Sequence, residues 1–155
     1  MKTTRKAELP DISQLAILFD EYRIFYHKKS NVEAAKNFLK ERIENKDSEI
    51  FVSEENGILI GFVQLYPLFS STRMKKYWLL NDLFVNKNFR GKGFSKALIE
   101  EAKELAKHSN ACGILLETGK SNEIGNQLYP SCGFEMYDEV NFYEWTNPIE
   151  TNDFQ

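Results

Sequence analysis

A glycine-containing segment at residues 90–95, RGKGFS, has the residue types of an anion-binding loop. Gly91 and Gly93 can adopt positive φ angles, and neither carries a Cβ atom that would keep a phosphate from the backbone. The following residues have the three-to-four spacing of a helix with one buried face, so a helix is expected to begin near Gly93. The first amides of a helix lack partners within it and its dipole is positive there, while Arg90 and Lys92 add formal charge. The segment predicts an anion site, with a plain glycine turn as the alternative.

Two common phosphate-binding motifs do not fit this segment. A P-loop has Lys and then Ser or Thr after its second glycine, whereas Phe94 follows Gly93 here. A dinucleotide-binding loop has a third glycine at a fixed spacing, and this sequence does not. Residues 78–85, WLLNDLFV, precede the segment and predict a mostly apolar strand, so the order is strand, short loop and helix.

Two polar residues, Asn81 and Asp82, interrupt that predicted strand. A lone carboxylate in an apolar strand costs free energy unless it is paired or hydrogen-bonded, so its presence needs a reason. A buried salt bridge is one reason. The interpretation that we favour is a functional role for Asp82, as a general base or as an anchor for a cationic amine. Glu117, at the end of the next predicted strand, is the competing carboxylate.

The elements before the loop follow from local patterns. Residues 3–8 predict a short strand, and a helix starts near residue 11, where Asp11 and Gln14 occupy capping-box positions. The dipeptide Asn56-Gly57 is a strong hairpin signal between two predicted strands. A second helix is expected over residues 32–43, and strands are expected over 49–53, 59–69 (weakened by Pro67) and 77–85.

After the loop and its helix, residues 113–118 predict a buried strand, a short helix is expected through 125–131, and 135–145 predicts a last strand pair. The predicted fold class is α+β, a mostly antiparallel twisted sheet flanked by helices in the order β-α-α-β-β-β-α-β-α-β(β). We expect a single domain at residues 1–146 and a polar C-terminal tail at 147–155.

Composition narrows the classes of function. The net charge of −3 and the pI of about 5.5 argue against a general nucleic-acid binder. Two cysteines are too few for a disulfide scaffold and fit a reducing compartment. No apolar run approaches the roughly 20 residues of a membrane span, so a cytoplasmic protein without membrane partners is expected. The two histidines lie far apart in sequence, so we expect no metal site.

Two motifs carry a resemblance to a known family. Residues 83–95, LFVNKNFRGKGFS, resemble the acyl-CoA-binding motif of the GNAT superfamily of N-acetyltransferases: Arg or Gln, two residues, Gly, one residue, then Gly or Ala. Ser95 occupies the last position. Residues 121–135, SNEIGNQLYPSCGFE, are similar to the closing pattern of the family. The matching residues are Asn122, Gly125, Leu128, Tyr129, Gly133 and Phe134. The chain is identified as a member of this superfamily.

The nearest branch includes polyamine acetyltransferases and histone or small-amine acetyltransferases. It resembles this chain in the strand pattern of Leu80, Asp82 and Val85. The polyamine enzymes have a glutamate base before the aspartate, and Asn81 stands there in this chain. Polyamine specificity is therefore not implied.

The resemblance implies acetyl-CoA as co-substrate, without a metal. Residues 83–85 would present backbone groups to the pantetheine arm, residues 90–95 would hold the pyrophosphate, and Asn122 would hydrogen-bond the arm. The implied cofactor-binding residues are Leu83, Phe84, Val85, Arg90, Gly91, Lys92, Gly93, Phe94, Ser95 and Asn122. Tyr129 is the implied acid, because a phenol of pKa about 10 stays protonated beside a leaving thiolate of pKa about 8.5.

The acceptor is expected to be a primary amine, from a small molecule or a lysine side chain, that attacks directly in a ternary complex. Tyr22, Tyr26 and Tyr66 are candidate substrate contacts because their rings can stack on a cation, although core packing explains them equally well. Asn81 and Glu117 are further candidate contacts. The alternative function is a non-catalytic acyl-CoA sensor. By resemblance, a homodimer is possible.

Overall fold

A computed structural model describes residues 1–149 of the 155-residue chain. The chain divides into two compact units, residues 1–117 and the residues from 118 onward. Most of the expected tail at 147–155 lies outside the described residues, and the single domain at 1–146 stays a prediction.

The first unit contains a five-stranded sheet in the spatial order β1-β2-β3-β4-β5. Neighbouring strands are antiparallel except for β5, which runs parallel to β4. The elements are β1 (Lys2–Lys6), a 3-10 turn (Leu9–Asp11), α1 (Ile12–Phe25), α2 (Val32–Asn45), β2 (Glu49–Glu55), β3 (Ile58–Ser70), β4 (Lys75–Val85), a second 3-10 turn (Lys87–Phe89), α3 (Phe94–His108) and β5 (Ile114–Leu115). This mixed, mostly antiparallel sheet with flanking helices confirms the predicted fold class.

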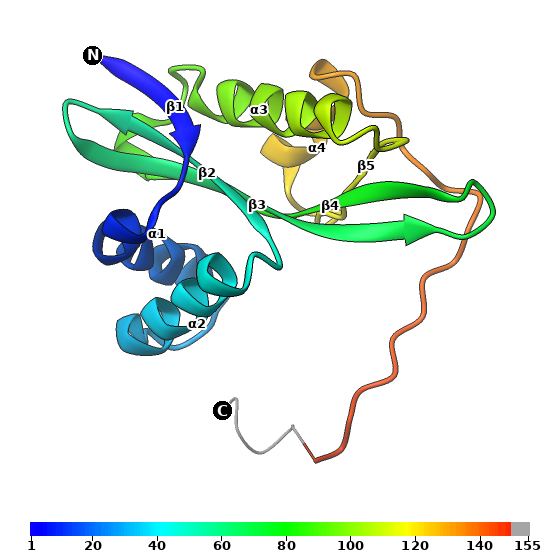
Figure 1. Cartoon of the computed structure of the whole chain (residues 1–155), viewed down its shortest axis with the longest axis horizontal. Coiled ribbons are helices and arrows are strands. Elements are labelled where there is room, and N and C mark those ends of the chain that lie inside the picture. The colour runs from blue at the N-terminus through cyan, green and yellow to red at the C-terminus, as the bar shows by residue number, and fades with distance from the viewer. Residues whose placement is uncertain (150–155) are drawn as a thin grey trace. The chain divides into compact units, whose positions relative to one another are not determined.

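Helices cover both faces of this sheet (Figure 1). Helices α1 and α2 pack on one face, around a core that includes Leu15, Leu39 and Phe62. Helix α3 packs on the other face, around Leu98 and Val63. Each helix presents an apolar stripe to the sheet and polar residues to solvent, and the burial of those stripes is the main source of stability.

The hairpins follow the sequence signals. Asn56 and Gly57 both have positive φ, at 53° and 82°, as a tight hairpin turn requires. Strand β3 continues through Pro67 to Ser70. The pairing of β3 with β2 ends at Leu65, so Pro67 lies where β3 has only β4 beside it. A proline tolerates such an edge because its missing N–H leaves no ladder bond unmade.

One irregularity in β4 decides which way its side chains point. Gln64 pairs with Asp82 and Leu65 pairs with Leu80, so Asn81 is an extra residue in β4. Leu80 contributes to the α3 core, whereas Phe84, beyond the bulge, contributes to the α1 and α2 core. The bulge therefore turns Asp82, two residues before Phe84, toward α1 and α2.

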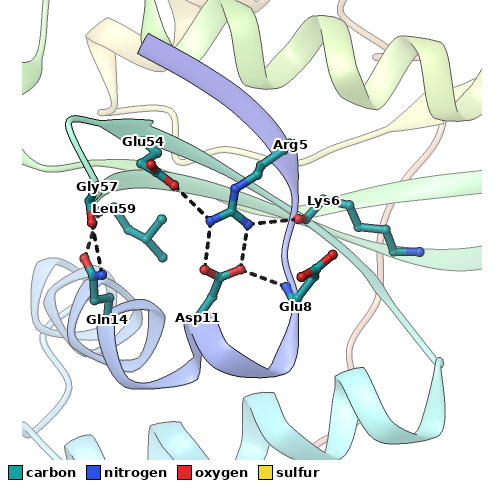
Figure 2. Close-up of polar contacts among 8 residues, drawn as sticks. All are labelled: Arg5, Lys6, Glu8, Asp11, Gln14, Glu54, Gly57 and Leu59. Carbon is teal, nitrogen blue, oxygen red and sulfur yellow. Dashed lines mark hydrogen bonds and ion pairs between the residues drawn. The ribbon is translucent and has the colours of Figure 1, made fainter. Parts of the chain in front are cut away.

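A charged cluster joins β1, β2 and the start of α1 (Figure 2). Arg5 donates from its two terminal nitrogens to Asp11 at 2.8 and 2.9 Å, and also to Glu54 at 2.9 Å. The predicted capping box of Asp11 with Gln14 is wrong. Asp11 instead accepts from the Glu8 amide, and Gln14 holds the β2–β3 turn through Leu59 N–H and the Gly57 carbonyl. Asp11 therefore belongs to a capping box with Glu8 in the 3-10 turn, and the Arg5 guanidinium is its second partner.

Helix α4 (Glu123–Ser131) is the regular element of the described second unit. The strand pair predicted over 135–145 is absent from the described residues. Its apolar side chains, such as Phe142, Tyr143 and Trp145, are exposed. An alternating pattern becomes a strand only where a partner supplies backbone hydrogen bonds and covers the apolar face, and the described second unit contains no other strand. The strand predicted over 113–118 is likewise only the two residues of β5, at the sheet edge.

Candidate active site

The first unit holds a buried carboxylate on the α1 and α2 side of the sheet. Asp82 is 5% exposed. Its Oδ2 accepts a hydrogen bond from Gln64 Nε2 at 2.8 Å, and its Oδ1 accepts one from Asn81 Nδ2 at 3.0 Å. The Tyr22 hydroxyl is a further hydrogen-bond partner and lies 3.5 Å from the Asn81 carbonyl. Asp82 is thus held from both neighbouring elements, α1 and β3.

Tyrosine rings gather beside this carboxylate. The rings of Tyr22 and Tyr26 meet edge to face, with centroids 5.0 Å apart. Burial, together with the charge of Asp82, raises the pKa of Tyr26, and raises the pKa of Tyr66 to about 12. The structure therefore brings together five residues that the sequence singled out separately. They are Tyr22, Tyr26, Tyr66, Asn81 and Asp82.

The protonation of Asp82 reflects a balance between burial and hydrogen bonding. Burial raises the pKa of Asp82 above its ordinary value, and the hydrogen bonds from Gln64, Tyr22 and Asn81 offset part of that rise. None of the ion pairs among residues 1–149 involves Asp82. The buried salt bridge that the sequence left open as an explanation is therefore not formed within the described chain.

The glycine loop has the geometry that its sequence predicted. Gly91 and Gly93 have φ angles of 75° and 86°, and a Cβ added at either glycine would meet no atom within 4 Å. Helix α3 begins at Phe94, and the amide of Ala97 is the first to bond back, to the Gly93 carbonyl at 3.1 Å. The amides of residues 94–96 therefore precede the helical hydrogen-bond ladder, at an exposed helix end where an anion is favourable.

The side chains of Phe94 and Arg90 contact the rest of the first unit, whereas the backbone amides at the start of α3 are exposed. Phe94 is buried in the α3 core, so only its amide is available to a ligand. Arg90 Nε donates to the Val85 carbonyl at 3.0 Å, and its guanidinium lies 5.6 Å from the centre of the Phe84 ring. Arg90 thereby ties the loop to the end of β4.

At the end of β4, the side chains are packed in the cores, so only the backbone is available to a ligand. Phe84 and Val85 are buried in opposite cores, and Leu83 packs against the α3 core. Strand β5 pairs with β4 only at Trp78 and Leu79. Within the first unit, the edge of β4 that faces away from β3 therefore has no strand beside it over residues 80–85. The peptide groups on that edge can bind an extended ligand.

In the second unit, Asn122 caps α4. Its Oδ1 accepts from the Gly125 amide at 3.1 Å, and its Nδ2 donates to Thr118 Oγ1 at 2.9 Å. A Cβ on Gly125 would lie 2.6 Å from Asn122 Nδ2, which explains a glycine at this position. The match to the family pattern at Asn122 and Gly125 thus has a structural basis of its own.

Tyr129 also has a structural role in α4. The Phe134 amide donates to the Tyr129 carbonyl and the Gly133 amide donates to the Pro130 carbonyl, with Gly133 at φ 88°. These two bonds form a Schellman motif, and the Tyr129 and Phe134 rings make its apolar contact at 5.9 Å. This arrangement accounts for the Gly-Phe pair, and the Tyr129 side chain is half-buried.

Sequence reasoning missed Gln64, which is fully buried and bonds Asp82 directly. The signal was present, because Gln64 is a polar residue inside an apolar run, as Asp82 is in the next strand. Glu117 is exposed beyond β5, and no interaction around Asp82 in residues 1–149 involves it. Within the same range, no cluster of three or more His, Cys, Asp or Glu is placed to hold a metal, and no helix is long and apolar enough to span a membrane.

Comparisons with known proteins identify the family to which the chain belongs. The model of the acetyltransferase (GNAT) family matches residues 14–134. The chain is 44% identical to "Uncharacterized N-acetyltransferase YhfO" of Bacillus subtilis strain 168 over 131 residues, which cover 84% of this chain and 88% of that protein. It is 31% identical to a "probable acetyltransferase" of Haemophilus influenzae, covering 90% and 94% of the two chains.

A solved structure supports the same conclusion for the fold. The crystal structure of a probable acetyltransferase superimposes with a TM-score of 0.88 at 34% sequence identity. The superposition covers 94% of this chain and 97% of the other.

Proposed function

The chain belongs to the acetyltransferase (GNAT) family and is an acetyl-CoA-dependent N-acetyltransferase, and we propose that its acceptor is a primary amine that enters the site as a cation. The acceptor is a small amine or a lysine side chain. The observation that carries this proposal is Asp82, a buried carboxylate without a cationic partner in the described chain. An ionised carboxylate is costly to bury alone, and an ammonium group would offset that cost.

The tyrosines beside Asp82 fit the same acceptor. Tyr22, Tyr26 and Tyr66 each interact with this carboxylate, and their rings can attract an ammonium group through the ring quadrupole. A carboxylic acid or phosphate acceptor would meet the negative charge of Asp82 instead. The proposal therefore predicts that uncharged or anionic nucleophiles are poor substrates.

The residues present fit acetyl-CoA as co-substrate. The open glycines, the exposed start of α3 and the charges of Arg90 and Lys92 suit its pyrophosphate, and the uncovered edge of β4 suits its extended arm. Residues 83–85 would contribute backbone groups and residues 90–95 the phosphate loop. A hydrogen bond from Asn122, which belongs to the second unit, is proposed from the family resemblance alone. When bound, acetyl-CoA supplies an activated acetyl thioester and a thiol leaving group.

Asp82 is the proposed base. Its carboxylate accepts a proton from the ammonium, directly or through water, and so frees the lone pair that attacks the acetyl carbon. The raised pKa of Asp82 makes it a better proton acceptor than an exposed carboxylate. As the C–N bond formed and the C–S bond broke, the amide nitrogen would lose its second proton to solvent. By the family resemblance, Tyr129 of the second unit is the proposed acid that would give its phenolic proton to the departing sulfur.

A thiol-release assay tests this function. Wild type is incubated with acetyl-CoA and a panel of polyamines, amino acids, aminoglycosides and lysine peptides, beside Tyr129→Phe and Asp82→Asn. We expect amine-dependent release that falls about 10²- to 10⁴-fold in Asp82→Asn. Asp20→Asn is the matched control, because Asp20 is equally buried but bonds Ser30 and Asn31 in the α1–α2 connection. Acetyl-CoA binding without release for any amine would contradict the proposal and favour a sensor.

A further inference from the structure

Gln64 is a buried polar residue whose place in the sheet calls for an explanation. It lies in the middle of β3 between the apolar core residues Val63 and Leu65, and it is 0% exposed. Burying an amide costs free energy unless its donors and acceptor are hydrogen-bonded. An aliphatic residue would fill this position more simply, so the amide must do something that an aliphatic side chain cannot.

Both ends of the Gln64 amide are used. Nε2 donates to Asp82 Oδ2 at 2.8 Å, and Oε1 accepts from Ser48 Oγ at 2.9 Å. An ionised carboxylate only accepts hydrogen bonds, so the amide must turn its nitrogen toward Asp82 and its oxygen toward Ser48. The carboxylate thereby decides which way the amide faces, and the Ser48 hydroxyl holds the amide in place by donating to its oxygen.

The bulge at Asn81 makes this contact possible. Gln64 and Asp82 are direct partners in the β3–β4 register, and the bulge places Asp82 on the same face as Gln64. The other carboxylate oxygen, Oδ1, accepts from Asn81, whose side chain is exposed. Gln64 therefore holds one oxygen of Asp82, Oδ2, while the other oxygen, Oδ1, lies toward the exposed Asn81 side chain.

We propose that Gln64, held in place by Ser48, is a positioning residue that fixes the Asp82 carboxylate so that Oδ1 faces the acceptor amine. This inference rests on the proposed function, because it assigns a role relative to the proposed base. The other titratable groups that face Asp82 are Tyr22 and Tyr26 from α1 and Tyr66 from β3. Burial and the charge of Asp82 raise the pKa of Tyr26, and that of Tyr66 to about 12, so these two groups do not titrate in the acidic range.

The first test compares the acidic limb of the kcat/KM profile in wild type and Gln64→Met. Methionine keeps the volume but loses the donor, and the Gln64 hydrogen bond favours the ionised form of Asp82. We expect the limb to move to higher pH, kcat at neutral pH to fall by about 10- to 100-fold, and KM for acetyl-CoA to stay unchanged. Gln64→Glu places a second carboxylate opposite Asp82, which disfavours ionisation of Asp82. The acidic limb of this variant is therefore also expected to move to higher pH.

Gln14→Met is the matched control. Gln14 also makes two hydrogen bonds in the first unit, but to the β2–β3 turn, so its loss should lower stability without moving the limb. Ser48→Ala keeps the Gln64 amide as a donor to Asp82 and removes only the bond that holds the amide oxygen. We expect a smaller shift of the acidic limb to higher pH, and this variant remains a test even if Gln64→Met folds poorly. Folded Gln64→Met and Ser48→Ala proteins whose profiles superimpose on wild type would overturn the proposal.

A titration separates this inference from the proposed function. Carboxyl carbon NMR of protein labelled at aspartate follows Asp82 without turnover, with Asp82→Asn assigning the signal. A higher titration midpoint of Asp82 in Gln64→Met, but not in Gln14→Met, supports the positioning of Asp82 by Gln64. Full activity of Asp82→Asn would rule out Asp82 as the base but would leave that result standing. An unchanged midpoint in Gln64→Met overturns the positioning role whatever the activity of Asp82→Asn.

Discussion

Gln64 and Asp82 face each other directly across β3 and β4, joined by a hydrogen bond of 2.8 Å. Each is a polar residue in an apolar strand, and each explains the burial of the other. The contact depends on one extra residue, Asn81, which turns Asp82 toward α1. A strand irregularity and a buried pair thus form one structural unit at the candidate site.

Asp82→Asn is expected to stabilise the fold at neutral pH. The folded-state pKa of Asp82 is raised by burial, so its contribution to stability is fully present below the unfolded pKa and is lost as pH rises through the folded value. At pH 7 the ionised group therefore costs stability that asparagine does not, because the exposed Asn81 amide can turn its oxygen toward the new amide nitrogen. We expect Tm at pH 7 to rise by a few degrees above the wild-type value. The gain should shrink as pH falls, and a lower Tm at pH 7 would show that Asp82 stabilises the fold.

Asp11→Asn is expected to destabilise the first unit, with the opposite pH dependence. The Arg5 guanidinium, through two hydrogen bonds, lowers the pKa of Asp11. That contribution is present above the unfolded pKa and is lost as pH falls through the folded value. Arg5 is 39% exposed and Asp11 is 11% exposed, so solvent screening limits the loss to about 1–2 kcal/mol.

Urea unfolding at several pH values measures that loss. Glu44→Gln is the control, because its pair with Lys40 is exposed on both sides and should contribute at most about 0.5 kcal/mol. Equal losses in the two variants would contradict a special role for the cluster in Figure 2.

Gly93→Ala is expected to weaken acetyl-CoA binding. Alanine at a φ of 86° costs about 1–2 kcal/mol, so the loop should relax away from the conformation that exposes the start of α3. KM for acetyl-CoA should rise about 5- to 10-fold. Gly57→Ala introduces similar strain at φ 82° in the β2–β3 turn and should lower Tm without changing this KM. The same KM change in both variants would argue against a specific phosphate loop.

Gly125→Ala is expected to loosen the start of α4. The new Cβ would lie 2.6 Å from Asn122 Nδ2, so the cap must shift, at a cost of about 1 kcal/mol. Hydrogen exchange of the amide at position 125 should quicken. At Gly119 a Cβ would be 3.9 Å from Ser121 Oγ, so Gly119→Ala should leave that exchange rate unchanged.

The sequence predicted most of the fold because its signals were local. Asn56-Gly57, the stripe of α3 and the glycines at 91 and 93 each act over a few residues, and all three predictions held in the structure. The strand pair predicted over residues 135–145 is absent because an alternating apolar pattern does not by itself supply a partner strand. The predicted cap of Asp11 with Gln14 was wrong because the Asp11 carboxylate binds Arg5 and the Glu8 amide, and the spacing of Asp11 and Gln14 indicates neither partner.

The candidate site was predicted in part. Asp82 and the tyrosines stood out by residue type, but their proximity depends on the β3–β4 register and on the bulge at Asn81, which no local pattern encodes. The partner of Asp82, Gln64, is identified only when β3 is placed beside β4. The roles of these residues in catalysis stay predictions.

The most direct test of the account is the pH dependence of amine-dependent thiol release, measured as kcat/KM for wild type and Asp82→Asn with the best amine of the panel. We predict that wild-type activity rises with pH through a midpoint above the ordinary pKa of an aspartate, and that Asp82→Asn loses this limb together with about 10²- to 10⁴-fold in rate. An Asp82→Asn enzyme with the wild-type rate and the wild-type limb would contradict the central claim.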